Sequence, residues 1–320
     1  MFYSRRDLGK AVLACGSAAA LVAKPDSNFG GVQIGVITYS FRALPGGAEA
    51  TLTYILDCGF NAIEMMSNVA ESYAGAPGQI GRNAGGGRRP MTPEQRAAAQ
   101  KATEETKKWR LSVPMDKYKA LRRMYEDAGV RTYAFKLPPT MAMSDQEYEY
   151  IWNVAETLGA NHITMELPTD DALLQRVAEY ATKRKLRIAF HTHGQGGSSG
   201  FEKALGASAY TALNLDVGHY YGVNGQSPVP VIEKYHDRIA SLHLKDRKGP
   251  AGGEGKKGLG GGPNMPWGEG ETPLKEVLQV MKKRKYGFPA SVEYEYSTPE
   301  GSDVLTEVKK CREYCRNALK

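Results

Sequence analysis

The sequence predicts an α/β protein of the (β/α)8 barrel class, with one barrel domain over residues 24–320 and long loops after the second and seventh strands. Short apolar runs rich in β-branched and aromatic residues recur along the chain, and a helical pattern follows each of them. No Gly-x-Gly-x-x-Gly fingerprint follows the first run, which argues against an open dinucleotide-binding sheet. The 320 residues are also enough for a barrel, a fold of roughly 250 residues.

Residues 1–23 have the features of an export signal. The segment Ser4-Arg5-Arg6-Asp7-Leu8-Gly9-Lys10 resembles a twin-arginine signal, and the apolar stretch from Ala11 to Ala23 is too short to span a bilayer. We therefore expect a periplasmic or otherwise exported protein, with no stable membrane insertion once the signal has been removed.

The charge pattern argues against a nucleic-acid-binding protein, and the cysteine spacing argues against a cysteine metal site or a disulfide. The net charge is +7, but no basic run is interleaved with aromatic residues as in nucleic-acid grooves, so no nucleic-acid partner is expected. Behind the signal, Cys58, Cys311 and Cys315 lack the spacing of a metal site, and Cys311 and Cys315 lie one helical turn apart, poorly placed for a disulfide. We expect all three to be structural.

Eight strands are expected, each bounded by turn residues or by a helical pattern. They are Gln33–Phe41, Asn61–Ser67, Arg131–Leu137, His162–Pro168, Arg187–His193, Ala212–His219, Ile239–Asp246 and Ala290–Tyr296.

Helices between these strands are indicated by the 3.6-residue period of Asp145–Leu158 and Asp170–Lys183, both of which begin at capping residues. Gly59, Gly129 and Gly159 stand where a helix should end before the next strand, as glycine in the left-handed conformation commonly does.

Two connections are unusually long. Val69–Met115 contains the glycine-rich run 85–90 and a polar helical stretch from Pro93 to Trp109, and Arg247–Glu271 is rich in Gly, Lys and Pro. Both leave the carboxyl ends of strands, where barrel enzymes build their sites, so lids or substrate-recognition loops are expected. Disordered insertions are the alternative.

Polar residues stand late in strands that should otherwise be apolar. In a barrel these ends converge on one axis, so residues far apart in sequence can meet within metal-bonding distance. One of them alone, such as Glu64, would more often be structural, but the set forms a mixed nitrogen and oxygen constellation suited to a transition metal. The set is Glu64, Lys136, Glu166, His191, His193, Asp216, His219, His243, Lys245, Glu293 and Glu295.

Three segments carry a family resemblance: Leu213-Asn214-Leu215-Asp216-Val217-Gly218-His219, Ser241-Leu242-His243-Leu244-Lys245-Asp246 and Val292-Glu293-Tyr294-Glu295. In order and spacing they resemble the last three metal-bearing strands of the xylose isomerase-like TIM barrel superfamily, which includes sugar phosphate isomerases/epimerases and apurinic-endonuclease-like barrels. The resemblance covers roughly residues 33–319.

The resemblance implies that Asp216, His243 and Glu293 are metal ligands and that His219 binds substrate or supports the metal site. The fourth ligand is open. Many relatives have a Glu at the end of strand 5, where this chain has Phe190-His191-Thr192-His193-Gly194. Either His191 takes that place or Glu166 reaches across from strand 4, and we favour Glu166, with His191 a ligand or close neighbour.

A nuclease of this superfamily is not expected. Such enzymes hold three zinc ions, with histidines on strands 2 and 3 and an Asp-x-His pair ahead of a Gly-Glu-Gly turn. The turn is present at 268–270, but Gly262 and Asn264 stand where the pair would be, and Glu64 and Lys136 replace the histidines.

We therefore expect one divalent metal ion (Mn²⁺, Co²⁺, Zn²⁺ or Fe²⁺) and proton abstraction next to a carbonyl, giving a sugar isomerase or epimerase. His193 is an attractive base because imidazole titrates near neutral pH, and its alternative role is to support His191 or the metal. Glu295, Lys136 and, if it is not a ligand, Glu166 are the other candidates for the base. Lys245 and Lys136 are candidates to hold a substrate oxygen.

The expected substrate is a non-phosphorylated sugar or keto-sugar, since an exported enzyme meets few sugar phosphates. The loop aromatics Trp267, Tyr220 and Tyr221 are candidates to stack on a pyranose ring. One alternative is a lyase or dehydratase acting on a 3-keto-glycoside or related polyol at the same site, and another is a carbohydrate-binding barrel without turnover. The sequence does not set the exact substrate, the metal or the oligomeric state.

Overall fold

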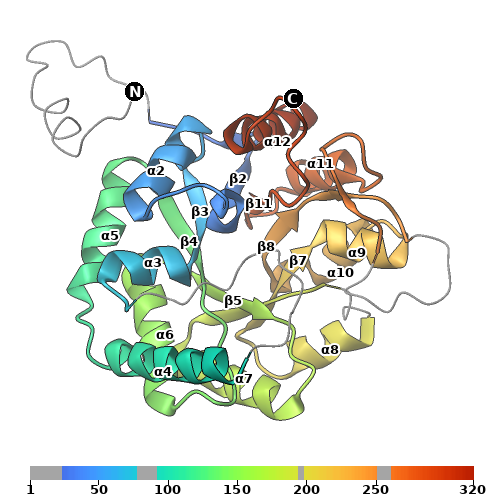
Figure 1. The fold of residues 1–320 in the computed structure, drawn as a ribbon. Helices are drawn as coiled ribbons and strands as arrows, with labels where there is room; N and C mark the ends of the chain where they lie inside the picture. Colours follow the sequence, from blue (N-terminus) through green and yellow to red (C-terminus); the bar gives the residue numbers. More distant parts are fainter. Residues whose placement is uncertain (1–23, 78–91, 194–197, 251–260) are drawn as a thin grey trace, which may run out of the picture.

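Eight parallel strands close into a barrel surrounded by helices in the computed structural model, which describes residues 24–77, 92–193, 198–250 and 261–320 (Figure 1). The sheet order is β1-β2-β11-β8-β7-β6-β5-β4-β3, and pairing of β2 with β3 closes the ring. The expected (β/α)8 barrel is thus confirmed. The expected signal at 1–23 and the glycine-rich run 85–90 lie outside the described residues.

Each barrel strand begins within one residue of its predicted start and ends earlier than predicted. The strands are β2 (Val32–Ile37), β3 (Ala62–Met66), β4 (Arg131–Lys136), β5 (His162–Glu166), β6 (Arg187–His191), β7 (Thr211–Asp216), β8 (Ile239–Leu244) and β11 (Ala290–Val292). The predicted ends were therefore wrong, because the chain turns as soon as it leaves the ladder. At β7, for example, Asp216 already caps the next helix by accepting a hydrogen bond from the His219 amide.

Short antiparallel pairs that the sequence did not predict flank the barrel. β1 (Asn28–Phe29) pairs with β2, and β9 (Asp246–Arg247) pairs with β10 (Asn264–Met265). The second pair begins the long loop after the seventh barrel strand, so this end of the loop is ordered against the barrel.

Helices cover the outside of the strands. They are η1 (Thr38–Phe41), α2 (Ala48–Asp57), α3 (Ser67–Ala74), α4 (Pro93–Arg110), α5 (Asp116–Asp127), α6 (Asp145–Leu158), α7 (Asp171–Arg184), α8 (Ser198–Gly206), α9 (Val217–Asn224), α10 (Val229–Tyr235), η2 (His236–Arg238), α11 (Leu274–Arg284) and α12 (Val304–Ala318). Within the described residues, no helix is long and apolar enough to cross a membrane.

The expected start and stop signals act as predicted. Ser144 accepts a hydrogen bond from the Glu147 amide, and the Glu147 carboxylate accepts one from the Ser144 amide at 2.9 Å, which caps α6. Gly59, Gly129 and Gly159 each have a positive φ, between 77° and 85°, the conformation that ends a helix cheaply only at glycine.

The helix α4, in the long loop after β3, is polar and has no buried residue, yet its last residue is firmly held. Arg110 donates two hydrogen bonds, of 2.7 and 3.0 Å, to the buried carboxylate of Glu71 on α3. The Tyr150 hydroxyl on α6 donates a third at 3.0 Å. The end of this polar helix is thereby fixed to the barrel by an ion pair largely shielded from water, beside Trp109, which packs against the core.

Candidate functional site

Four buried side chains meet at the carboxyl ends of four consecutive barrel strands. His191 ends β6, Asp216 ends β7, His243 lies in β8, and Glu293 directly follows β11. Each offers one nitrogen or oxygen atom, and these atoms all lie within 4.8 Å of one another. We call these four residues the buried tetrad.

Strand register explains how this group forms. Asp216 and His243 are direct partners in the β7–β8 ladder, and Ser291, two residues before Glu293, is the partner of His243 in the β8–β11 ladder. Because side chains two residues apart share one face of a strand, the tetrad members point into the same layer of the barrel interior.

The His243 ring is held between two carboxylates. Nε2 lies 2.6 Å from Glu64 Oε2 and Nδ1 lies 2.7 Å from Glu293 Oε2, while the Thr164 hydroxyl donates to the other Glu64 oxygen at 2.6 Å. Burial alone would lower the pKa of His243, but the charges of Glu64 and Glu293 outweigh it and raise the pKa to about 10. Burial likewise opposes ionisation of Glu64, yet His243 brings its pKa down to about 2.

The His191 ring is oriented by a neutral partner, the side-chain amide of Asn214. Its Nδ1 lies 2.8 Å from Asn214 Oδ1, and the Asn214 amide group donates to Ser241 at 2.6 Å. Since a carbonyl oxygen only accepts, Nδ1 carries the proton and Nε2 keeps the lone pair. That nitrogen lies 3.7 Å from Asp216 Oδ2, on the side of the tetrad. Burial lowers the pKa of His191 well below its usual value.

Asp216 has one oxygen that is satisfied and one that is not. Oδ1 accepts the His219 amide at 2.7 Å. Oδ2 is buried and, although the Lys245 ammonium lies 3.0 Å away, it accepts no well-aligned hydrogen bond from any described residue. Burial raises the pKa of this carboxyl. A buried carboxylate oxygen without a hydrogen bond, facing a second carboxylate and two imidazoles, is what a divalent metal would complete.

A second group, which we call the open triad, lies beside the tetrad and consists of Lys136, Glu166 and His193. His193 Nδ1 lies 2.5 Å from Glu166 Oε2, and Lys136 Nζ lies 3.4 Å from Glu166 Oε1. The side chains of Glu166 and His193 are 43% and 30% exposed, whereas all four tetrad members are buried. Glu166 therefore contacts Lys136 and His193 and is not one of the four tetrad residues. Its predicted role as a metal ligand stays a prediction.

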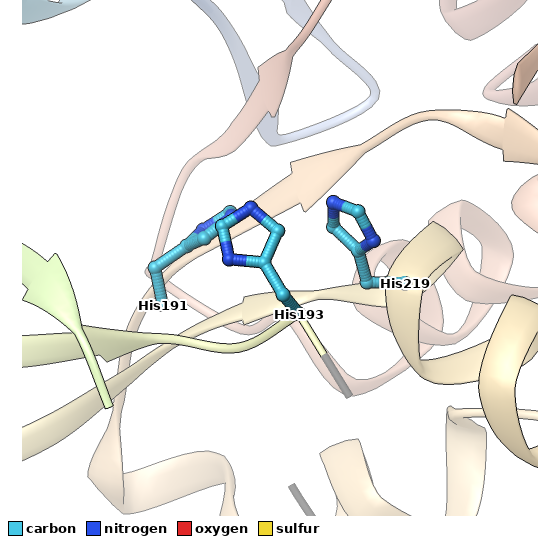
Figure 2. A group of neighbouring side chains, drawn as sticks. All are labelled: His191, His193 and His219. Atoms are coloured by element: carbon cyan, nitrogen blue, oxygen red, sulfur yellow. The ribbon is translucent and has the colours of Figure 1, made fainter. Parts of the chain in front are cut away.

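His191, His193 and His219, whose side chains lie close together in Figure 2, form a second set of possible ligands. Their ligand atoms all lie within 4.8 Å of one another. The His193 and His219 rings are 4.4 Å apart between centroids, and those of His191 and His193 are 4.7 Å apart. Because Asn214 occupies Nδ1 of His191, only Nε2 remains for a metal. The two sets share that nitrogen and therefore exclude each other as sites for two ions.

Lys245 and Arg247 approach this cluster from the end of β8. Lys245 Nζ lies 2.6 Å from Glu295 Oε2 and 3.1 Å from His219 Nε2, and the Arg247 guanidinium donates to His219 Nδ1. Arg247 also donates to the Gly262 carbonyl at 2.7 Å, which ties the loop after the seventh barrel strand to the site. Of the expected site residues, Glu295 and Lys245 thus form a pair directly beside the tetrad.

Sequence reasoning gave no role to Asn214 and Arg247, and none specific to Glu64. Asn214 stands two residues before Asp216, so its position on the same strand face was the available signal. The expected stacking residue Trp267 packs edge-on against Tyr314 at 5.7 Å, a packing contact.

Known proteins resemble parts of this chain and its fold. The family described as "Xylose isomerase-like TIM barrel" matches residues 172–314. An inosose dehydratase of Clostridium botulinum is 25% identical over 155 residues, which cover 45% of this chain and 51% of that protein. The chain thus matches about half the length of this curated relative.

Two solved structures show the same fold at low identity. The probable 3-DHS dehydratase of Bacillus anthracis has a TM-score of 0.59 at 14% identity, covering 88% of this chain and 97% of that one. The 3-keto-D-glucoside 4-epimerase of E. coli has a TM-score of 0.56 at 10% identity, covering 89% and 99%. The closed barrel and the family match over residues 172–314 agree with the resemblance found in the sequence to the xylose isomerase-like TIM barrels, and the solved structures show the same fold.

Proposed function

We propose that the protein is a metal-dependent enzyme that removes a proton from the carbon next to a carbonyl of a non-phosphorylated sugar or keto-sugar, as an isomerase or epimerase. The observation that carries this proposal is the contact between the buried tetrad and a partly exposed imidazole–carboxylate pair, His193 and Glu166. The first group suits a metal ion, and the second suits a base that a substrate can reach.

The tetrad residues His191, Asp216, His243 and Glu293 would hold the metal. Two imidazoles and two carboxylates are a donor set that Mn²⁺, Co²⁺, Fe²⁺ and Zn²⁺ all accept, so the metal's identity stays open. When bound, a divalent ion supplies a Lewis acid that polarises a carbonyl and stabilises the negative charge that develops on it.

His193 is the proposed base. Its Nδ1 lies 2.5 Å from Glu166 Oε2, a buried oxygen that accepts no well-aligned hydrogen bond from the described residues. We assign the ring proton to Nδ1, on the side of the carboxylate, and the basic lone pair to Nε2. The carboxylate also stabilises the imidazolium that forms when Nε2 takes a proton from carbon. Lys136, at 3.4 Å from the same carboxylate, limits how much negative charge Glu166 presents.

The Lys245–Glu295 pair, also beside the tetrad, is the proposed second group that handles protons or holds a substrate oxygen. Glu295 is partly exposed and lies 2.6 Å from the ammonium. His219, fixed by Arg247, completes this group. An epimerase must return a proton on the face opposite to the base, so it needs a second proton-handling group beside the same metal site.

A dehydratase is the second candidate, because the curated relative is an inosose dehydratase and one similar structure is a probable 3-DHS dehydratase. The first step is the same removal of a proton by His193. The electron pair then forms a carbon–carbon double bond and the hydroxyl on the next carbon leaves as water, with a proton from the Lys245–Glu295 pair.

Two measurements test the proposal. Elemental analysis of protein prepared without chelator should find one divalent transition metal per chain. In deuterium oxide, the metal-loaded protein should exchange deuterium into a keto-sugar, and a dehydratase would also yield an unsaturated ketone seen by its ultraviolet absorbance. Binding of keto-sugars without any exchange or elimination would contradict the enzyme and favour a barrel that only binds carbohydrate.

We also propose that the protein is exported by its twin-arginine segment, which is why phosphorylated sugars are not the expected substrates. Replacing Arg5 and Arg6 together with lysine should leave the precursor in the cytoplasm, because the receptor of this route reads the arginine pair. Cell fractionation measures this, and unchanged export after the double replacement would show that the segment works in another way.

A further inference from the structure

Lys245 is a buried lysine surrounded by carboxylates. Its Nζ lies 3.0 Å from Asp216 Oδ2, 2.9 Å from Glu293 Oε2 and 2.6 Å from Glu295 Oε2. Two of these partners, Asp216 and Glu293, belong to the buried tetrad, and only Glu295 lies outside it. The ammonium therefore contacts two of the groups that would bind a metal.

The carboxylates, and not the neighbouring imidazole, hold the ammonium in this place. Arg247 can only donate, so His219 Nδ1 must accept its hydrogen bond, and Nε2 then carries the ring hydrogen of the neutral imidazole. That hydrogen faces Lys245 Nζ, itself a donor, at 3.1 Å. The contact with His219 cannot be a favourable hydrogen bond while the lysine is charged, and burial disfavours an unpaired ammonium. The negative charges of the three carboxylates offset both the unfavourable contact with His219 and the cost of burying the ammonium.

The backbone leaves the lysine stem little choice of direction. Gly218, in the first turn of α9, lies so close to Lys245 that a Cβ added there would come within 2.4 Å of both the Cγ and the carbonyl oxygen of Lys245. The absence of a side chain at Gly218 is therefore what lets the stem run past α9 toward the tetrad. A lysine on the same strand end without this gap would have to point elsewhere.

We propose that Lys245 is a built-in counter-ion of the buried tetrad, which holds Asp216 and Glu293 together before a divalent metal binds and which the metal displaces from these two carboxylates. This inference rests on the proposed metal site. Two cations cannot both lie near the same carboxylate oxygens without strong repulsion in a buried site. After displacement, the ammonium keeps Glu295, its partner outside the tetrad, and faces the substrate side.

The inference predicts that Lys245→Met lowers the stability of the metal-free protein but raises its affinity for a divalent metal. In Lys245→Met the stem stays and the charge is lost, so the metal-free protein loses the counter-ion of its carboxylates while an incoming metal meets no competitor. We expect the melting temperature of the metal-free variant to fall by about 5 °C or more. We expect its affinity for Mn²⁺ to rise by about tenfold or more.

The matched control is Lys136→Met. Lys136 is also a lysine near the site, but its ammonium pairs with Glu166, outside the tetrad. Calorimetric titration with Mn²⁺ and thermal unfolding of the chelator-treated protein are measured for both variants and the natural chain. The control should change Mn²⁺ affinity much less than Lys245→Met does. Lys245→Arg, which keeps the charge, should bind Mn²⁺ no more tightly than the natural chain.

The outcomes separate the inference from the metal site itself. If Lys245→Met binds Mn²⁺ with unchanged or lower affinity while the natural chain binds it, Lys245 is not a competing counter-ion and the inference is wrong. If neither protein binds Mn²⁺ or another divalent ion, the proposed metal site fails as well. Should Lys245→Met not fold without metal, refolding with Mn²⁺ should restore the barrel, and failure to do so contradicts the inference.

Discussion

The buried tetrad and the open triad lie side by side at the same end of the barrel, yet they are built in different ways. In the tetrad, each of the two imidazoles is oriented by a buried partner outside the tetrad, His243 by Glu64 and His191 by Asn214. In the triad, His193 and Glu166 are partly exposed. Exact placement suits ions, which need fixed ligands, whereas access to solvent suits a group that must meet a substrate.

The largest effect should come from breaking the tetrad. Asp216→Ala or His243→Ala removes a ligand and leaves an incomplete coordination shell, so both metal retention and turnover should be lost. Elemental analysis and a turnover assay measure this, after circular dichroism has shown that each variant is folded. A variant that kept its metal at full occupancy would exclude that residue as a ligand.

Breaking the triad should separate turnover from metal binding. His193→Ala should lower turnover by about 10²–10⁴-fold, the usual contribution of a general base, while the metal content stays at the level of the natural chain. Loss of the metal together with turnover would instead favour the set of His191, His193 and His219 as the ligand group, and the assignment of His193 as base would then be wrong.

A smaller effect on metal affinity is expected when the residue that orients a tetrad side chain is changed and the tetrad itself is kept. In Glu64→Gln the carboxylate that holds His243 Nε2 becomes an amide, so we expect the metal to bind about 10–100-fold more weakly while the ligands remain present. Metal titration measures this. Thr164→Val, which removes only the hydroxyl that contacts Glu64, is the control and should have the smaller effect.

The smallest effect on the site is expected from Arg110→Ala, which breaks the ion pair that fixes α4. It leaves the buried Glu71 carboxylate without the guanidinium and should cost about 2–4 kcal/mol of unfolding free energy. Denaturant unfolding measures the loss. Metal affinity should stay within twofold or so of the natural chain, because neither residue contacts tetrad or triad in the described structure, and a large loss of metal would link α4 to the site.

The sequence was sufficient for the barrel because strand starts depend on local patterns, such as the mainly apolar segments that follow the helix-ending residues Gly59, Gly129 and Gly159. The predicted strand ends were wrong because a strand ends where its hydrogen bonds to the neighbouring strands end. The sequence of one strand does not show where its neighbours stop pairing with it. For the candidate site, motifs pointed to Asp216, His243 and Glu293, which the structure brings together and whose role as ligands stays a prediction. The contact of Glu64 with His243 could not be predicted, since it joins residues 179 apart whose meeting depends on closure of the barrel.

Closure of the barrel also sets the order in which the protein can mature. The tetrad draws His191, Asp216 and His243 from consecutive strands, but Glu293 follows β11, the last strand of the ring to be synthesised. A nascent chain that has released only the first seven barrel strands therefore has three of the four proposed ligands and no closed ring. The complete tetrad can form only after that final strand has docked between β8 and β2. Loading with metal would then mark a finished barrel, and release of the ion would be an early sign that the ring has opened.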